Sequence, residues 1–216
     1  NLVNALRHAE LHEIPQVQAD SRRELADAYL ALNLLPEAVA LYDQVIASCL
    51  QLEAPIDLAW AQIRRSEALA RLGRTPEAEA GLQGVLSVLT ADSNPVGEAM
   101  ARLQLAALEL NRAAFAPAMV HAQHAAAAFA QARVLGWQLE AQLLQARALW
   151  RLSEVSAART QLHAALGQAN TLPELAAASH TLLGDLCRQG DAVADLPQAR
   201  HHYQQAVALL TAQQAR

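Results

Sequence analysis

The sequence predicts an all-α chain built as an array of helical hairpins. Three observations predict this fold class. Alanine, a strong helix former, makes up about a quarter of the 216 residues. Glycine and proline occur only eight times each, too rarely for an all-β chain with frequent turns. A residue pattern also recurs every forty positions, which is typical of repeat proteins.

The forty-residue recurrence centres on an alanine that often follows proline. The matching segments are Leu34–Ala38, Arg74–Ala78, Ala114–Ala118, Glu154–Ala158 and, offset by forty-one, Asp195–Ala199. The eight prolines fall into two columns half a period apart: Pro36, Pro76, Pro117 and Pro197 in one, and Pro15, Pro55, Pro95 and Pro173 in the other. Proline is tolerated in the first turn of a helix and disfavoured in its interior, so each column predicts helix starts.

These starts divide the chain into successive elements. We expect the second helix of a truncated repeat at 1–14, and then five hairpins in one continuous repeat domain at 15–54, 55–94, 95–134, 135–172 and 173–216. Apolar residues follow helical spacing between the turns, for example Leu25, Ala28, Tyr29 and Leu32. Thr75 and Asn94 are expected N-caps. Because the chain begins with Asn inside an expected helix, we expect it to be a piece of a longer protein.

The first full repeat carries a recognisable motif. Leu25-Ala26-x-x-Tyr29, followed by Glu37-Ala38-x-x-x-Tyr42-x-x-Val45, resembles the tetratricopeptide repeat pattern. Parts of this pattern return in the other copies, and the fourth copy departs most, with Gln145-Ala146 and Leu149. The period exceeds the ~34 residues of the standard repeat. The chain is therefore similar to the longer variety found in bacterial signalling regulators and eukaryotic adaptor proteins.

The resemblance implies a right-handed α-solenoid of stacked antiparallel helical hairpins; HEAT-like hairpins of comparable length are the alternative. Close stacking needs small residues where helices cross. Two columns of small residues meet this need: Ala26, Ser66, Ala106, Ala146 and Gly184 in the first helices, and Ala38, Ala78, Ala118, Ala158 and Ala199 in the second helices.

In tetratricopeptide arrays the first helix of each hairpin lines a concave groove. By this resemblance the residues expected to bind a partner are Arg23, Asp27, Trp60, Ile63, Glu67, Met100, Leu103, Leu110, Leu143, Arg147, Trp150 and Arg151. Trp and Arg are typical anchors of interfaces. Trp60 and Trp150 could equally fill the gaps between first helices as ordinary core.

The expected function is a protein–protein interaction scaffold that holds a peptide, helix or protein partner in the groove. The alternative is an effector-sensing segment of a bacterial transcription regulator, signalling ATPase or caspase-like protease. All sixteen basic residues are arginine, which argues against groove lysines that grip a chaperone's C-terminal carboxylate. The net charge of −5 disfavours nucleic acid and anionic lipid as partners.

No catalytic, cofactor or metal motif is found, so no enzyme activity is expected. His8 with His12, and His121 with His124, each share a helix face, but no Cys or acid completes either set, and we interpret them as solvated. His201 and His202 are adjacent and should point to different faces. Cys49 and Cys187 lack metal-like spacing, and with no signal segment they fit a cytoplasmic location.

The two ends of the array are expected to expose apolar surface. Leu2, Leu6 and Leu11 begin the chain without a preceding helix, and Val207 and Leu210 close it without a polar capping helix. Terminal repeats need such caps for solubility. We therefore expect weak self-association through these ends.

Overall fold

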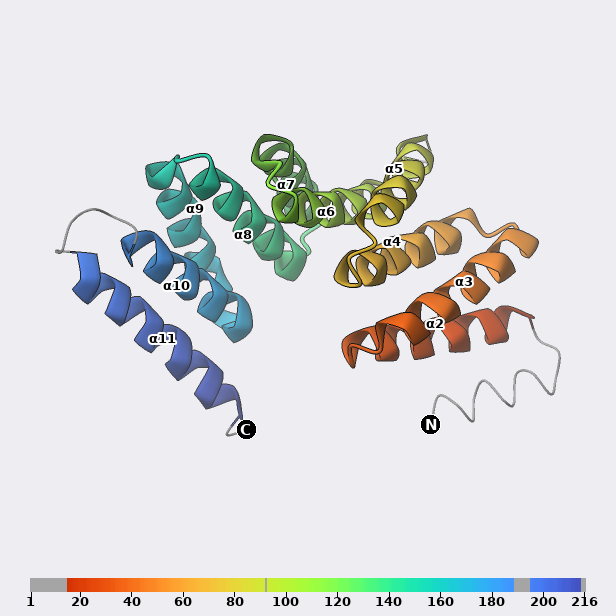
Figure 1. Cartoon of the computed structure of the whole chain (residues 1–216), viewed down its shortest axis with the longest axis horizontal. Helices are drawn as coiled ribbons and strands as arrows, with labels where there is room; N and C mark the ends of the chain where they lie inside the picture. Colours follow the sequence, from red (N-terminus) through yellow and green to blue (C-terminus); the bar gives the residue numbers. More distant parts are fainter. Residues whose placement is uncertain (1–14, 92, 189–194, 215–216) are drawn as a thin grey trace. The chain divides into compact units, whose positions relative to one another are not determined.

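The computed structural model describes residues 15–91, 93–188 and 195–214. Within these ranges the chain is helical and contains no β-strand, which confirms the predicted all-α fold class (Figure 1). The expected helix at 1–14 lies outside the described residues. The chain divides into two compact units, 1–108 (unit 1) and 109–216 (unit 2), with the boundary inside one helix. The grouping of five repeats into one continuous domain stays a prediction.

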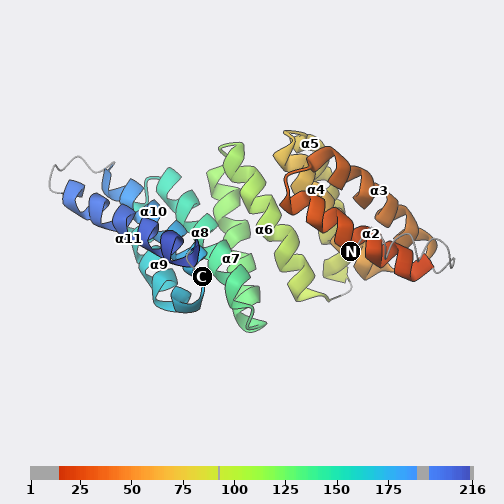
Figure 2. The same cartoon turned by 90° about the horizontal axis from the view of Figure 1, so that it is seen from below.

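The described residues of unit 1 form four helices and most of a fifth. These are α2 (Pro15–Ala31), α3 (Leu35–Gln51), α4 (Pro55–Arg71), α5 (Thr75–Ala91) and α6 (Pro95–Asn111). Each helix has seventeen residues and starts twenty residues after the previous one. Consecutive helices from α2 to α5 pack side by side and run antiparallel, as Figures 1 and 2 show.

Unit 2 keeps the seventeen-residue helix length in α7 (Phe115–Gln131) and α8 (Leu135–Arg151), and its later helices differ from this length. It also contains α9 (Val155–Gln168), a 3₁₀ turn η1 (Ala169–Thr171), α10 (Pro173–Arg188) and α11 (Leu196–Gln214). Neighbouring helices from α7 to α11 pack against each other, and α10 also contacts α8. Every proline of the chain lies within the first three residues of its helix, as the two proline columns predict.

Each of the first seven described turns stops its helix with the same backbone device. In the first turn, the N–H of Asn33 donates to the carbonyl of Leu30, and the N–H of Leu34 donates to that of Tyr29. These two bonds define a Schellman motif, which requires a left-handed residue after the helix. That residue recurs every twenty positions: Asn33, Glu53, Gly73, Ser93, Ala113, Arg133 and Ser153, with φ between 52° and 80°.

Side-chain N-cap hydrogen bonds are few at the starts of the described helices. Asn94 is an N-cap as predicted, because its Oδ1 accepts the Gly97 N–H at 2.9 Å. Thr75 is instead the first residue of α5, so the prediction of a cap there is wrong. No side-chain cap bond is made at the starts of α3, α4, α7, α8 and α9. The hairpins therefore depend on the Schellman turns and on packing.

Both predicted columns of small residues lie in the core. Ala26, Ala106 and Ala146 are 0% exposed, and Ser66 is 2% exposed. The second-helix alanines are exposed by 3% or less. Gly184 shows why the column must be small, because a Cβ there would lie 2.7 Å from the Tyr203 ring. Burial of these positions confirms the predicted register of the hairpins.

Candidate functional site

Four of the residues expected to bind a partner are buried instead. The exposed fractions are 0% for Ile63, 5% for Met100, 2% for Leu103 and 6% for Leu143. Ile63, Leu103 and Leu143 occupy the ninth position of their helices, so the same face of each first helix turns inward. The prediction that these side chains contact a partner is therefore wrong: in this fold they are core residues.

The remaining apolar candidates lie at the edge of the core. Trp60, Leu110 and Trp150 are each partly buried. Trp150 packs against the unit 2 core cluster that includes Leu143 and Ala146. This tryptophan therefore contributes to the core with one part of its surface and leaves another part accessible.

The charged candidates of unit 1 are paired with each other or with neighbours. Arg23 lies 3.3 Å from Asp20 and 3.5 Å from Asp57. Asp27 accepts a hydrogen bond of 2.5 Å from the Tyr42 hydroxyl and one of 3.1 Å from Arg64 Nε. These contacts tie α2 to both α3 and α4.

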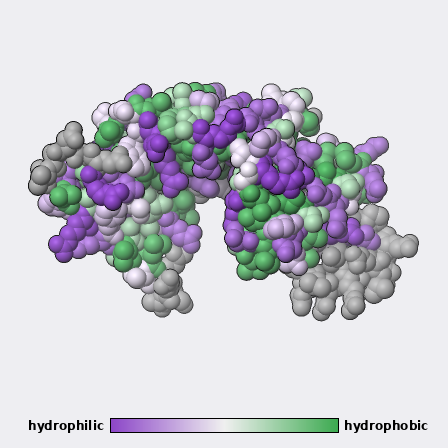
Figure 3. Space-filling view, viewed as in Figure 1, coloured by the Kyte–Doolittle hydropathy of each residue, from purple (hydrophilic) through white to green (hydrophobic). Residues whose placement is uncertain are grey.

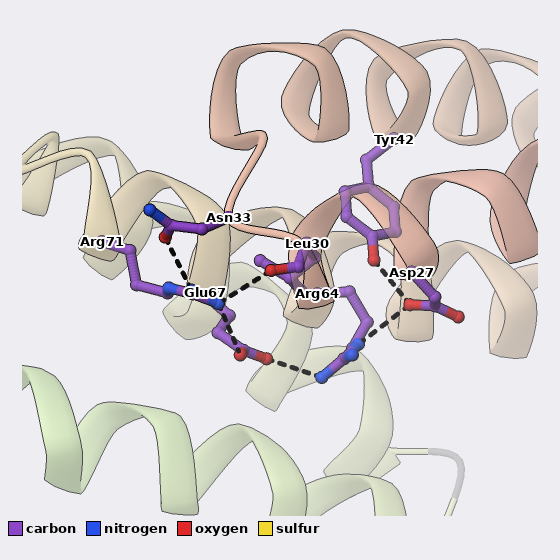
Figure 4. A network of polar contacts seen from close by, with 7 residues as sticks. All are labelled: Asp27, Leu30, Asn33, Tyr42, Arg64, Glu67 and Arg71. Carbon is purple, nitrogen blue, oxygen red and sulfur yellow. Dashed lines mark hydrogen bonds and ion pairs between the residues drawn. The ribbon is translucent and has the colours of Figure 1, made fainter.

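The pairing extends along α4 (Figure 4). Arg64 donates to Glu67 at 2.6 Å, and Arg71 lies 4.0 Å from the same carboxylate. Arg71 also donates to the Asn33 side chain at 2.7 Å and to the Leu30 carbonyl at 3.1 Å, at the end of α2. Each charge on this face of α2 and α4 thus has a partner within unit 1. We call Asp27, Tyr42, Arg64, Glu67 and Arg71 the unit 1 network.

Two members of the network, Tyr42 and Arg64, have shifted pKa values. Burial, followed by the hydrogen bond to Asp27, raises the pKa of the Tyr42 phenol well above its usual range. Burial by itself would lower the pKa of Arg64, but Glu67 and Asp27 outweigh it and raise that pKa. The phenol is therefore neutral and the guanidinium charged at neutral pH.

Unit 2 repeats only part of this arrangement. The Tyr203 hydroxyl donates to Asp185 at 2.7 Å, and these two residues occupy the same helix positions as Tyr42 and Asp27. In α8 the position equivalent to Asp27 carries Arg147, and in α10 the position equivalent to Arg64 carries Leu182. The ion pair that joins α2 to α4 therefore has no counterpart between α8 and α10.

Two exposed arginines lie at the end of α8. Arg147 is exposed, and no described residue forms an ion pair with it. Arg151 is also exposed, with its guanidinium carbon 4.8 Å from the centre of the Phe115 ring, which is a cation–π contact. With the partly accessible Trp150 between them in sequence, they form what we call the α8 strip: Arg147, Trp150 and Arg151.

Among the described residues of unit 2, α11 bears the most exposed large apolar side chains. Leu196, Val207 and Leu210 are exposed by 54%, 60% and 45%. A groove of about 600 Å³ runs beside them and is lined by Arg188, Leu196, Ala199, Arg200, Tyr203, Gln204, Val207 and Ala208. Figure 3 shows apolar side chains reaching the visible surface among polar ones.

The histidines partly differ from expectation. His8 and His12 lie outside the described residues. His124 is exposed as expected, but His121 is partly buried and its Nδ1 lies 3.2 Å from Glu109 Oε2. Sequence spacing also missed a group formed by His163, His180, His201 and His202, which come from three helices of unit 2. No local motif could reveal it, because only the packing of α9, α10 and α11 brings these residues together.

Among the described helices, none is long and apolar enough to cross a membrane. No protein-family model matches the chain, and no curated protein matches it. Solved structures do match. BtubC from P. vanneervenii superposes with a TM-score of 0.81 at 16% identity, over 100% of this chain and 90% of that chain.

Two further structures share the fold over part of their length. A Rap protein complexed with Competence and Sporulation Factor matches 93% of this chain and 58% of its own, with a TM-score of 0.75 at 12% identity. A signal transduction ATPase with a tetratricopeptide repeat sensor, from Pyrococcus horikoshii, matches 93% of this chain and 38% of its own, with a TM-score of 0.65 at 16% identity. The chain thus has the fold of tetratricopeptide-like helical repeat proteins.

Proposed function

We propose that the chain is a protein-interaction module that binds an acidic peptide or helix along the α8 strip of unit 2. The observation that supports this most strongly is the contrast in charge pairing between the units. Asp27 and Glu67 are neutralised by arginines of the unit 1 network. On the corresponding face of unit 2, Arg147 has no acidic partner among the described residues.

The composition of the α8 strip suits such a partner. Arginine forms bidentate hydrogen bonds with carboxylates, and a partly accessible tryptophan beside it offers apolar area. An extended or helical segment with acidic residues around an apolar anchor would satisfy both groups. The Rap structure, solved with Competence and Sporulation Factor bound, is an example of this fold in complex with another molecule.

The alternative proposal is that the chain senses an effector for an attached domain. It is supported by the similarity to the Pyrococcus horikoshii ATPase, which has a tetratricopeptide repeat sensor and of which this chain covers 38%. The two proposals share a binding surface, and they differ in whether binding there acts on an attached domain. Both therefore depend on the same first experiment.

That experiment selects binders from a displayed library of random peptides and measures their affinities by fluorescence anisotropy. We expect selected peptides to be enriched in Asp and Glu around an apolar residue. Their binding should weaken with added salt, because the contacts are between exposed charges. Arg147→Glu combined with Arg151→Glu should weaken binding about tenfold or more.

The matched control is Arg133→Glu, which changes an exposed arginine of the same unit in the turn before α8. This variant reverses one arginine charge, as each substitution in the double variant does, but it leaves the α8 strip intact. Its affinity for the selected peptides should therefore stay within about twofold of the wild type. Trp150→Ala should cost about 2 kcal/mol of binding free energy, with circular dichroism showing that the variant remains folded. Peptides without acidic enrichment, or equal binding by the double variant, would contradict the proposal.

A further inference from the structure

Four histidines gather where three helices of unit 2 meet. His163 lies on α9, His180 on α10, and His201 and His202 on α11. The Nδ1 atoms of His180 and His202 are 3.0 Å apart, and their ring centroids are 5.3 Å apart. The His163 and His201 rings lie 6.4 Å and 5.9 Å from the His202 ring.

The central pair is kept neutral by its surroundings. Burial, followed by the nearby His201 and His163, lowers the pKa of His180. Burial also lowers the pKa of His202, as do the other three histidines and Arg159. At neutral pH, therefore, the rings can share one proton between the facing nitrogens or offer their lone pairs to a ligand.

The spacing of the two nitrogens suits a single metal ion. With Zn–N bonds of about 2.0–2.1 Å, two nitrogens on one ion lie about 2.8–3.4 Å apart for angles between a right angle and the tetrahedral value. The 3.0 Å separation of the Nδ1 atoms falls within this range. Neutral imidazole favours zinc, copper and nickel over magnesium or calcium.

We propose that His180 and His202 bind a divalent transition-metal ion of the zinc type, with His163 as the third protein ligand. No group of three or more His, Cys, Asp or Glu among the described residues is already arranged to hold an ion. His163 is exposed and its ring contacts the His202 ring, so a change of its side-chain rotamer would place a third nitrogen at the ion, and water would complete the coordination shell. The bound ion would link α9, α10 and α11.

The direct test follows the histidine ring signals of the wild-type chain by NMR, with isotope-labelled histidine, during titration with zinc sulfate at pH 7.5 and at pH 5. At the higher pH, signals of His180, His202 and His163 should change together in a saturable step. At the lower pH the step should weaken, because protons compete with the metal for the same nitrogens. Magnesium should produce no such step.

Variants assign the site and separate it from the other histidine pairs. His180→Ala and His202→Ala should each lose this binding step while remaining folded by circular dichroism, and His163→Ala should weaken it. His201→Ala is the matched control, since it removes the exposed neighbour on α11 and should leave the step intact. Zinc that shifts only the signals of His8, His12, His121 or His124 would overturn the proposal. Undiminished binding by both His180→Ala and His202→Ala would overturn it as well.

Discussion

Tyrosine and aspartate at two fixed helix positions connect the two helices of the first and fifth hairpins. Tyr42 is fully buried, and its hydroxyl donates to Asp27, which also accepts from Arg64. Tyr203 donates to Asp185 in the same way. The aromatic residue of the motif thus does more than fill space, because its hydroxyl satisfies a carboxylate at the edge of the core.

Replacement of the buried phenol tests this role. Tyr42→Phe removes the hydrogen bond to a charged acceptor and should lower the free energy of unfolding by about 1.5–3 kcal/mol at neutral pH. The folded-state pKa of Tyr42 is raised, so the stabilising contribution is full below about pH 10 and is lost as pH rises above it. Urea unfolding at pH 7 and above pH 10 should therefore show the difference between wild type and variant shrinking.

Tyr29→Phe provides the comparison, because Tyr29 packs against the same core cluster. It should change the stability less than Tyr42→Phe does. Equal losses from the two variants would show that the Tyr42 hydroxyl has no special role.

The histidine pair predicts a second pH dependence, of opposite direction. The folded-state pKa values of His180 and His202 are lowered, so the folded chain disfavours their protonation. Stability should be full above the unfolded value of about 6.5 and fall as pH decreases below it. His163 and His201 face the pair and help to lower both pKa values, and Arg159 helps to lower the pKa of His202. Metal-free thermal unfolding of wild type and His202→Gln at pH 7.5 and 5.5 measures this, and the variant should lose less stability.

At the scale of the element, backbone conformation decides where each helix stops. Six of the seven left-handed turn residues are not glycine, although a side chain there costs about 1–2 kcal/mol. The cost is tolerated because each turn closes two Schellman hydrogen bonds and sets the packing of the next helix. Regular spacing of twenty residues follows from this repeated stop.

Glycine substitutions in these turns should therefore stabilise the chain. Ala113→Gly removes the strain at φ 59° and should raise the free energy of unfolding by about 0.5–1 kcal/mol. Gly73→Ala should lower it by about 1 kcal/mol, from backbone strain only, because no atom lies within 4 Å of the added Cβ. Gly84→Ala, inside α5 with equally open space, is the control and should stabilise by about 0.5–1 kcal/mol. If Gly73→Ala also stabilises, the turn conformation is wrong.

Small residues decide how closely neighbouring helices pack. Ala118 is 0% exposed, so Ala118→Leu should overpack the core and cost about 1–3 kcal/mol. Ala127→Leu, on the exposed side of the same helix, should change stability by less than about 0.5 kcal/mol. Chemical unfolding measures both variants. An unchanged midpoint for Ala118→Leu would contradict the register of α7.

At the scale of the whole molecule, the last described helix leaves open the face that its equivalents bury. Leu35 and Cys49 of α3 are exposed by 7% and 3%, whereas Leu196 and Leu210, at the same positions of α11, are exposed by 54% and 45%. In α3 this face packs against α4. Apolar surface of this kind favours association with another chain.

We therefore expect weak, concentration-dependent self-association. Val207→Asp with Leu210→Asp should shift sedimentation toward the monomer, because charge on the α11 face opposes burial. Val120→Asp, at an isolated apolar residue of α7 that is 44% exposed, should leave the distribution unchanged. A wild-type chain that sediments as a monomer at high concentration would contradict this expectation.

The fold class, the helix starts and the two columns of small residues could be predicted from the sequence. These features are local: proline restricts the first turn of a helix, and apolar spacing follows the helical period. Similar reasoning placed Asn94 at a helix start, where it accepts the Gly97 N–H.

The packing of the helices, which the sequence does not show, determines which first-helix residues remain accessible and which charges are paired. Ile63 and Leu103 are buried because neighbouring helices cover the ninth position, and the sequence does not record how far that cover extends. Arg64 contacts Asp27, which is thirty-seven residues away in the sequence, and His180 contacts His202, which is twenty-two residues away. Such contacts depend on how separate helices pack together, and residue spacing within one helix does not reveal this.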